Sequence, residues 1–159
     1  MAKGSSSYTD FNNLMQQLDK NQIAPVYLLH GEEYYFLEQL LQKIDEVVVD
    51  PSTASFNKHV MYGKETQVSD IVNIARRFPM MADKQLVVLK EAQYSKSPDA
   101  ILPYIENPLD STVLVWYHPG KKLPMNRKLG IAMKKHAVVY TGDAVPEREV
   151  TVVAKSYIE

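Results

Sequence analysis

Residues 26–41 read VYLLHGEEYYFLEQLL, and the spacing of their apolar residues changes at Gly31. The continuous apolar run 26–29 is typical of a strand buried on both faces, as in a parallel sheet. After Gly31 the apolar residues recur every three or four positions, which is the period of an amphipathic helix. They extend to Val48, just before Pro51. The segment therefore predicts a buried strand, a glycine turn and a long helix.

The rest of the chain repeats this alternation of strand and helix. We expect further strands at residues 55–62, 86–89, 112–116 and 137–140. We expect further helices at about residues 9–18, 66–78, 97–106 and 126–135. Because parallel neighbours need a crossover helix between them, this order predicts an α/β fold. Helices would cover both faces of a mainly parallel five-stranded sheet.

The composition is that of an ordinary globular chain, with 45% hydrophobic and 23% charged residues among 159. The 18 Lys and Arg residues nearly balance the 19 Asp and Glu residues, which argues against a surface that binds nucleic acid all over. The chain has no cysteine, so disulfides, iron–sulfur clusters and thiol nucleophiles are excluded. We expect a cytoplasmic protein without a membrane segment, because no apolar run approaches the length that spans a bilayer.

The turn at Gly31 lies where nucleotide-binding folds carry the phosphate loop, Gly-x-x-x-x-Gly-Lys-Ser/Thr. Counted from Gly31, Phe36 replaces the second glycine, Leu37 the lysine and Glu38 the hydroxyl. Three carboxylates would face a triphosphate here, whereas an acidic first turn is ordinarily favoured by the helix dipole. The sequence therefore predicts a degenerate nucleotide site without a cofactor.

No other segment carries recognisable catalytic chemistry. The apolar strand 86–89 is followed by Lys90 and Glu91 rather than by the Asp-Glu pair that holds magnesium. The four histidines lie far apart, and none shows a zinc-binding spacing. We therefore predict no catalytic residue and no metal site, and we keep a divergent nucleotide-binding enzyme only as an alternative.

The most specific segment is residues 76–92, RRFPMMADKQLVVLKEA. It occurs together with YLLHGEE at 27–33, FN at 56–57, YGK at 62–64, and NP at 107–108 before TVLV at 112–115. In this order and spacing, the segments resemble the delta subunit family of bacterial DNA polymerase III. The resemblance covers about residues 25–140, which match the first domain of that family.

The resemblance implies a P-loop NTPase-like (AAA+, RecA-like) three-layer sandwich that has lost ATP binding. It implies a subunit of a DNA-directed DNA polymerase holoenzyme with no turnover of its own. Such a domain binds and opens the β sliding clamp, so that the ring can be placed on primed DNA. The other clamp-loader subunits, gamma/tau and delta prime, would be contacted through parts beyond residue 159. On this basis we expect a flexible tail at 1–8, the clamp-binding domain at 9–143, and the first helix of a lid-like domain at 144–159.

Two adjacent apolar residues before the central strand bind the clamp in this family, and the matching positions are Met80 and Met81. Family members often carry leucine and phenylalanine there, so the methionine pair is a departure. Pro79 ends the preceding helix, and methionine suits a surface that adapts to a partner's pocket. The residues alone favour a cap on the core for both methionines, and the resemblance reverses this interpretation. We place Phe78 in the core.

A basic segment remains as a second candidate site. Residues 111–142 contain no acidic residue, and Lys121, Lys122, Arg127 and Lys128 lie within them, followed by Lys134 and Lys135. Such a segment can contact DNA phosphates or an acidic partner. The absence of aromatic residues between the lysines favours a solvated helix and turn instead. A DNA-binding module is therefore kept as a further alternative function.

Overall fold

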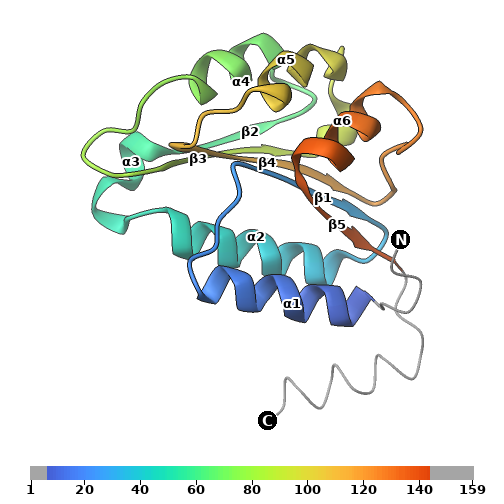
Figure 1. Ribbon diagram of the computed structural model, residues 1–159. Helices are drawn as coiled ribbons and strands as arrows, with labels where there is room; N and C mark the ends of the chain where they lie inside the picture. The colour runs from blue at the N-terminus through green and yellow to red at the C-terminus, as the bar shows by residue number, and fades with distance from the viewer. Residues whose placement is uncertain (1–6, 144–159) are drawn as a thin grey trace.

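The computed structural model describes residues 7–143 (Figure 1). The helix expected at 144–159, and residues 1–6 of the tail expected at 1–8, lie outside this part of the chain. Helix α1 begins at Ser7. Within residues 7–143, no helix is long and apolar enough to cross a membrane.

Five strands form one sheet in the order β2-β3-β4-β1-β5, and all four neighbouring pairs are parallel. The strands are β1 (Val26–Gly31), β2 (Lys58–Tyr62), β3 (Gln85–Lys90), β4 (Thr112–Pro119) and β5 (Val138–Gly142). The mainly parallel five-stranded sheet predicted from the sequence is confirmed. Because every strand runs the same way, the amino ends of the strands form one edge of the sheet and the carboxyl ends the opposite edge.

Helices cover both faces of the sheet and complete a three-layer sandwich. The helices are α1 (Ser7–Asp19), α2 (Tyr34–Val48), α3 (Ala54–Asn57), α4 (Val68–Ala75), α5 (Leu102–Glu106) and α6 (Lys128–His136). Figure 1 shows α1 and α2 on one face and α4, α5 and α6 on the other. Short 3₁₀ turns occupy Pro51–Thr53, Ala92–Tyr94 and Pro98–Ile101.

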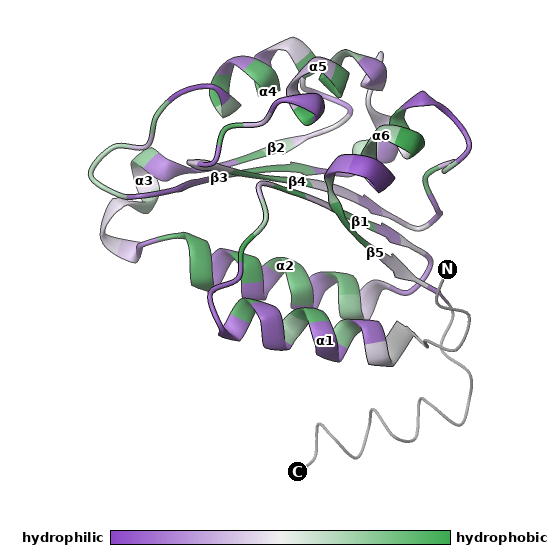
Figure 2. Cartoon of the chain, viewed as in Figure 1, coloured by the Kyte–Doolittle hydropathy of each residue, from purple (hydrophilic) through white to green (hydrophobic). Residues whose placement is uncertain are grey.

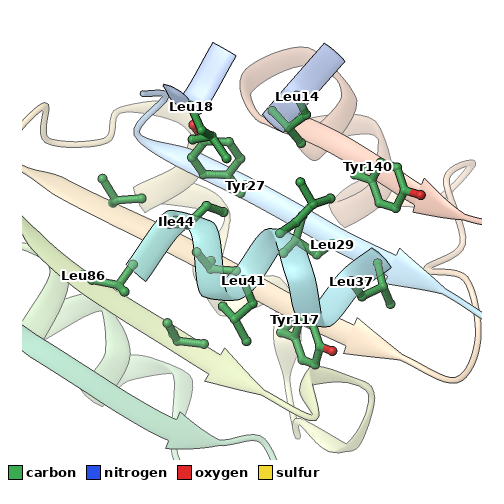
Figure 3. Packing of buried hydrophobic residues seen from close by; sticks show 14 of the residues in the cluster. Leu14, Leu18, Tyr27, Leu29, Leu37, Leu41, Ile44, Leu86, Tyr117 and Tyr140 are labelled. Carbon is green, nitrogen blue, oxygen red and sulfur yellow. The ribbon is translucent and has the colours of Figure 1, made fainter. Parts of the chain in front are cut away.

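Each face of the sheet has its own hydrophobic core. Tyr27 and Leu29 of β1 point into the cluster beneath α1 and α2, whereas Val26 and Leu28 point into the cluster beneath α4, α5 and α6. The central strands are therefore hydrophobic through their middle residues, with polar residues at their ends, while the helices alternate hydrophobic and hydrophilic residues (Figure 2). Figure 3 shows side chains of α2 packed over the sheet in the first cluster. Burial of each large aliphatic side chain stabilises the fold by about 1.5–3 kcal/mol.

Two of the expected segments each divide into two elements in the structure. The extended segment expected at 55–62 begins as α3, and only Lys58–Tyr62 forms a strand. The Asp50 carboxylate caps the turn that starts at Pro51 by accepting a bond from the Ser52 N–H, and helical geometry then continues to Asn57. The helix expected at 97–106 is a 3₁₀ turn followed by α5.

Candidate functional site

Helix α2 begins with an acidic cap at the place of a phosphate loop. Glu33 is the N-cap residue, and its carboxylate accepts a hydrogen bond from the backbone N–H of Tyr35. The free N–H groups at a helix N-terminus are the groups that bind phosphate in a nucleotide site. One of these donors is already bonded to a carboxylate here, and the negative charge of Glu33 repels a second anion.

Strand β5 packs directly against the same junction. The backbone N–H of Glu33 donates to the carbonyl oxygen of Gly142 at 3.0 Å. Gly31 has a φ of 125°, and a Cβ atom at this position would lie 2.4 Å from the Gly142 oxygen. Gly31 therefore meets the backbone of a neighbouring strand, and this close approach accounts for the glycine without any ligand.

The remaining phosphate-loop positions belong to the core. Phe36 and Leu37, at the glycine and lysine positions, are 1% and 0% exposed. Glu38, at the hydroxyl position, accepts a hydrogen bond from the Tyr117 hydroxyl. Burial raises the pKa of Tyr117 and the bond to Glu38 raises it further, so the hydroxyl stays protonated as a donor. The degenerate site predicted from the sequence is thus filled by contacts within the chain.

The acidic pair that holds magnesium in a nucleotide site is also missing after β3. Glu91, directly after β3, is exposed and caps a 3₁₀ turn with a φ of 53°. Within the described residues 7–143, no three His, Cys, Asp or Glu side chains are grouped so that they could hold a metal ion.

A buried histidine ties three segments together at the carboxyl edge. His30 of β1 is 1% exposed. Its Nδ1 accepts from the Leu123 N–H at 2.8 Å, and its Nε2 lies 2.9 Å from the Thr141 hydroxyl oxygen. The pKa of His30 is lowered to about 4, mainly by burial and also by the nearby His118 and Lys122, while Asp143 opposes them. His30 is therefore neutral at physiological pH and holds the β4–α6 loop to the sheet.

We expect this histidine to make the fold acid-sensitive. Its pKa is 6.5 in an unstructured chain and about 4 in the fold, so between these values the unfolded chain binds a proton that the folded chain does not. The free energy of unfolding should therefore be fully retained above pH 6.5 and should fall by about 3 kcal/mol as the pH drops toward 4. Urea unfolding at a series of pH values measures this dependence. Because the pKa of His118 is lowered too, the His30→Asn variant isolates the share of His30, and an unchanged slope in that variant would contradict the assignment.

The loop of residues 76–84 lies at the opposite, amino edge of the sheet. Helix α4 ends at Ala75, and the buried Gln85 side chain donates from Nε2 to the carbonyl oxygens of Ile74 and Arg77 at 3.0 and 2.8 Å. Bonding these carbonyls satisfies acceptors that a helix C-terminus otherwise leaves free. Pro79 lacks an N–H and cannot continue the helix.

Three apolar side chains of this loop project into solvent. Met80 is 56% exposed, Met81 85% and Phe78 76%. The expectation that Phe78 lies in the core is wrong. The helix ends before Phe78, so the side chain no longer follows the apolar face of α4. Apolar character alone does not distinguish such a side chain from a core residue, because only the position of the helix end decides where it points.

The backbone of Met80 is fixed by a side chain from another element. Asn57, at the end of α3, is 1% exposed. Its Oδ1 accepts from the Met80 N–H at 2.8 Å, and its Nδ2 donates to the Met80 carbonyl oxygen at 2.7 Å. Met81 follows in the left-handed region, with a φ of 59°. Figure 1 shows α3 beside the loop that leads into β3.

Comparison with known proteins identifies the family of the chain. A family model described as DNA polymerase III, delta subunit, matches residues 27–141. The chain belongs to this family. The DNA polymerase III subunit delta of Bacillus subtilis (strain 168) is 30% identical over 149 residues, which are 87% of this chain and 43% of that protein. This delta-family chain thus spans less than half the length of that relative.

Solved structures agree with the fold. The Bacillus subtilis DNA clamp loader delta protein superposes with a TM-score of 0.83 at 30% identity, over 90% of this chain and 45% of that one. A DNA polymerase III gamma subunit-related protein from Thermotoga maritima gives a TM-score of 0.55 at 18% identity, over 91% and 49% of the two chains. The P-loop NTPase-like (AAA+) fold expected of the delta family is confirmed.

The basic residues singled out in the sequence of this delta-family chain lie at the carboxyl edge, far along the strands from Met80. Lys121 and Lys122 follow β4, and Arg127 and Lys128 begin α6. All four are exposed. Lys122 forms an ion pair with Asp143, so its charge is partly balanced within the chain. The two predicted sites are thus separate, because they occupy opposite edges of a parallel sheet.

Proposed function

We propose that this chain is the clamp-binding part of a clamp-loader delta subunit, with Met80 and Met81 as the residues that enter an apolar pocket of the β sliding clamp. The observation that carries the proposal is the exposed methionine pair on an anchored loop, in a chain of the delta family. Adjacent exposed apolar side chains form a contiguous patch, and such patches mark surfaces that a partner covers. Phe78, exposed beside the pair, enlarges the same surface.

The proposed work on the clamp is mechanical rather than catalytic. Binding at the apolar loop favours a clamp with one interface open, and the energy comes from apolar burial instead of nucleotide hydrolysis. A divergent nucleotide enzyme is not favoured, because Glu33, Glu38 and Gly142 occupy the junction where a nucleotide would bind. The other clamp-loader subunits, gamma/tau and delta prime, would be further partners in the assembled complex. The complex would act on primed DNA in the cytoplasm.

The direct test is binding of this chain to the β clamp of the same organism, immobilised on a sensor surface. We expect saturable binding that persists in high salt, because apolar burial depends weakly on ionic strength. Failure to bind, by a chain shown to be folded, would overturn the proposal.

A second proposal concerns the basic residues at the carboxyl edge. We propose that Lys121, Lys122, Arg127 and Lys128 contact phosphates of primed DNA within the assembled complex. Neutralising Lys121, Arg127 and Lys128 to glutamine should lower the salt slope of DNA binding by about 2 to 3, since each phosphate contact releases about one counterion. Titration of labelled primed DNA at several salt concentrations measures the slope. Substitution of Lys134 and Lys135, at the far end of α6, is the matched control, and an equal effect there would indicate nonspecific attraction.

A further inference from the structure

The contact between Asn57 and Met80 pairs a side-chain amide with both backbone groups of one residue. The Nδ2 donates to the Met80 carbonyl oxygen at 2.7 Å and the Oδ1 accepts from the Met80 N–H at 2.8 Å. The two residues lie 23 positions apart in the chain, in different elements. Because Asn57 is 1% exposed, the amide is itself fixed by its surroundings and provides a rigid template.

Asparagine suits this position better than the other side chains of similar size. The pairing needs one donor and one acceptor in the same plane, and a carboxamide provides both. An aspartate would keep the acceptor but would place a negative oxygen against the Met80 carbonyl. Leucine or alanine would leave both backbone groups of Met80 without this partner.

The loop needs such an anchor because its backbone departs from ordinary preferences. Met81 has a φ of 59°, a conformation that costs a non-glycine residue of order 1–3 kcal/mol and persists only where the surroundings enforce it. Pro79, directly before Met80, has no N–H with which to form a hydrogen bond. Gln85 fixes the start of the loop at Ile74 and Arg77, and Asn57 fixes its tip.

We propose that Asn57 is the positioning residue for the clamp-binding tip. Its amide holds Met80 and Met81 in the conformation that binds, so that the ordering of the loop is completed during folding rather than during association. The inference rests on the proposed function of the methionine pair. Asn57 is buried and touches no partner. By ordering the loop before association, it nevertheless controls the affinity with which Met80 and Met81 bind.

The test has one measurement on the free chain and one on the complex. In the free chain, Asn57→Ala should speed amide hydrogen exchange at Met80 and Met81, without changing exchange in β1 or β4. In clamp binding, the same variant should raise Kd about threefold to tenfold, since the binding-competent loop is then only partly populated. The variant Asn57→Asp keeps the size and the acceptor, and it should show the same direction of both effects. It keeps the test valid if Asn57→Ala does not fold.

A double-mutant cycle separates positioning from general loss of stability. In the Met80→Ala/Met81→Ala background, Asn57→Ala should have no further effect on clamp affinity, because the side chains that it positions are gone. Thr141→Val is the control, since it removes a hydroxyl that contacts buried His30 at the opposite edge and should leave Kd unchanged. If the methionine variant weakens binding while Asn57→Ala and Asn57→Asp leave Kd and exchange unchanged, the positioning role is wrong and the proposed function stands. If the methionine variant itself binds normally, the proposed function fails, and only the faster exchange would still support an anchoring role for Asn57.

Discussion

Replacing both Met80 and Met81 with alanine should weaken clamp binding about a hundredfold. The two side chains are 56% and 85% exposed in the free chain, so most of their apolar surface is available for burial by a partner. Burial of a methionine side chain contributes about 1.5–3 kcal/mol, and 3 kcal/mol for the pair after ordering costs corresponds to about two decades of affinity. Surface-binding titration of the double variant against the wild-type chain measures the change.

The same substitution should leave folding almost unchanged, which makes the result interpretable. Exposed side chains bury little surface within the chain, so the free energy of unfolding should shift by no more than about 0.5 kcal/mol. Ile131→Ala is a matched control, because Ile131 on α6 is 56% exposed, like Met80, but lies outside the 76–84 loop. If Ile131→Ala weakened binding as much as the double variant, the assignment of the contact to the methionine pair would be contradicted.

Most of the fold was predictable because its central strands are continuous apolar runs. A strand such as Thr112–Pro119, buried along its whole length, needs apolar residues on both faces, and no surface helix has that pattern. The short α3 was missed because its four residues are too few for a helical period to be visible. Its geometry follows from the Asp50 cap and from the bond between Asn57 and Met80, and that bond joins residues far apart in sequence.

The candidate site was predictable to a different degree at each edge. The loss of phosphate-binding groups at the carboxyl edge follows from residue types alone, since Leu37 cannot neutralise a phosphate. The apolar loop at the amino edge could be located, but its exposure could not. The exposure of Phe78 depends on where α4 ends, and the bonds from Gln85 to the Ile74 and Arg77 carbonyls at that end are tertiary contacts. Sequence patterns report which residues are apolar, whereas the end of a helix decides which of them reach solvent.

The two edges of the sheet are built from different contacts. At the amino edge the sheet and α3 fix the loop that carries Met80, and this needs only a rigid parallel sheet. At the carboxyl edge the β5 backbone fills the junction and bonds to Glu33, so the space is used for stability. The carboxyl edge is thus a packed junction, and the amino edge carries a loop that is hydrogen-bonded to α3.

Replacing Gly31 with alanine tests the packing at this junction and should lower the free energy of unfolding by about 3 kcal/mol or more. A φ of 125° is strained for any residue with a Cβ atom, at a cost of order 1–3 kcal/mol. In addition, the new Cβ would lie 2.4 Å from the Gly142 oxygen, so β5 would have to move and its hydrogen bond to Glu33 would lengthen. Urea unfolding of the variant and the wild-type chain measures the difference.

Gly120→Ala is the matched control, because Gly120 also has a positive φ, of 94°, but its Cβ would meet only the Tyr34 hydroxyl at 3.1 Å. Tyr34 is 55% exposed and can move aside, so this variant should lose only the strain cost of about 1–2 kcal/mol. The difference between the two variants therefore measures the close approach of β5. If both variants were equally destabilised, the strain at positive φ alone would explain the glycine at position 31. The close approach of β5 would then contribute nothing to its requirement.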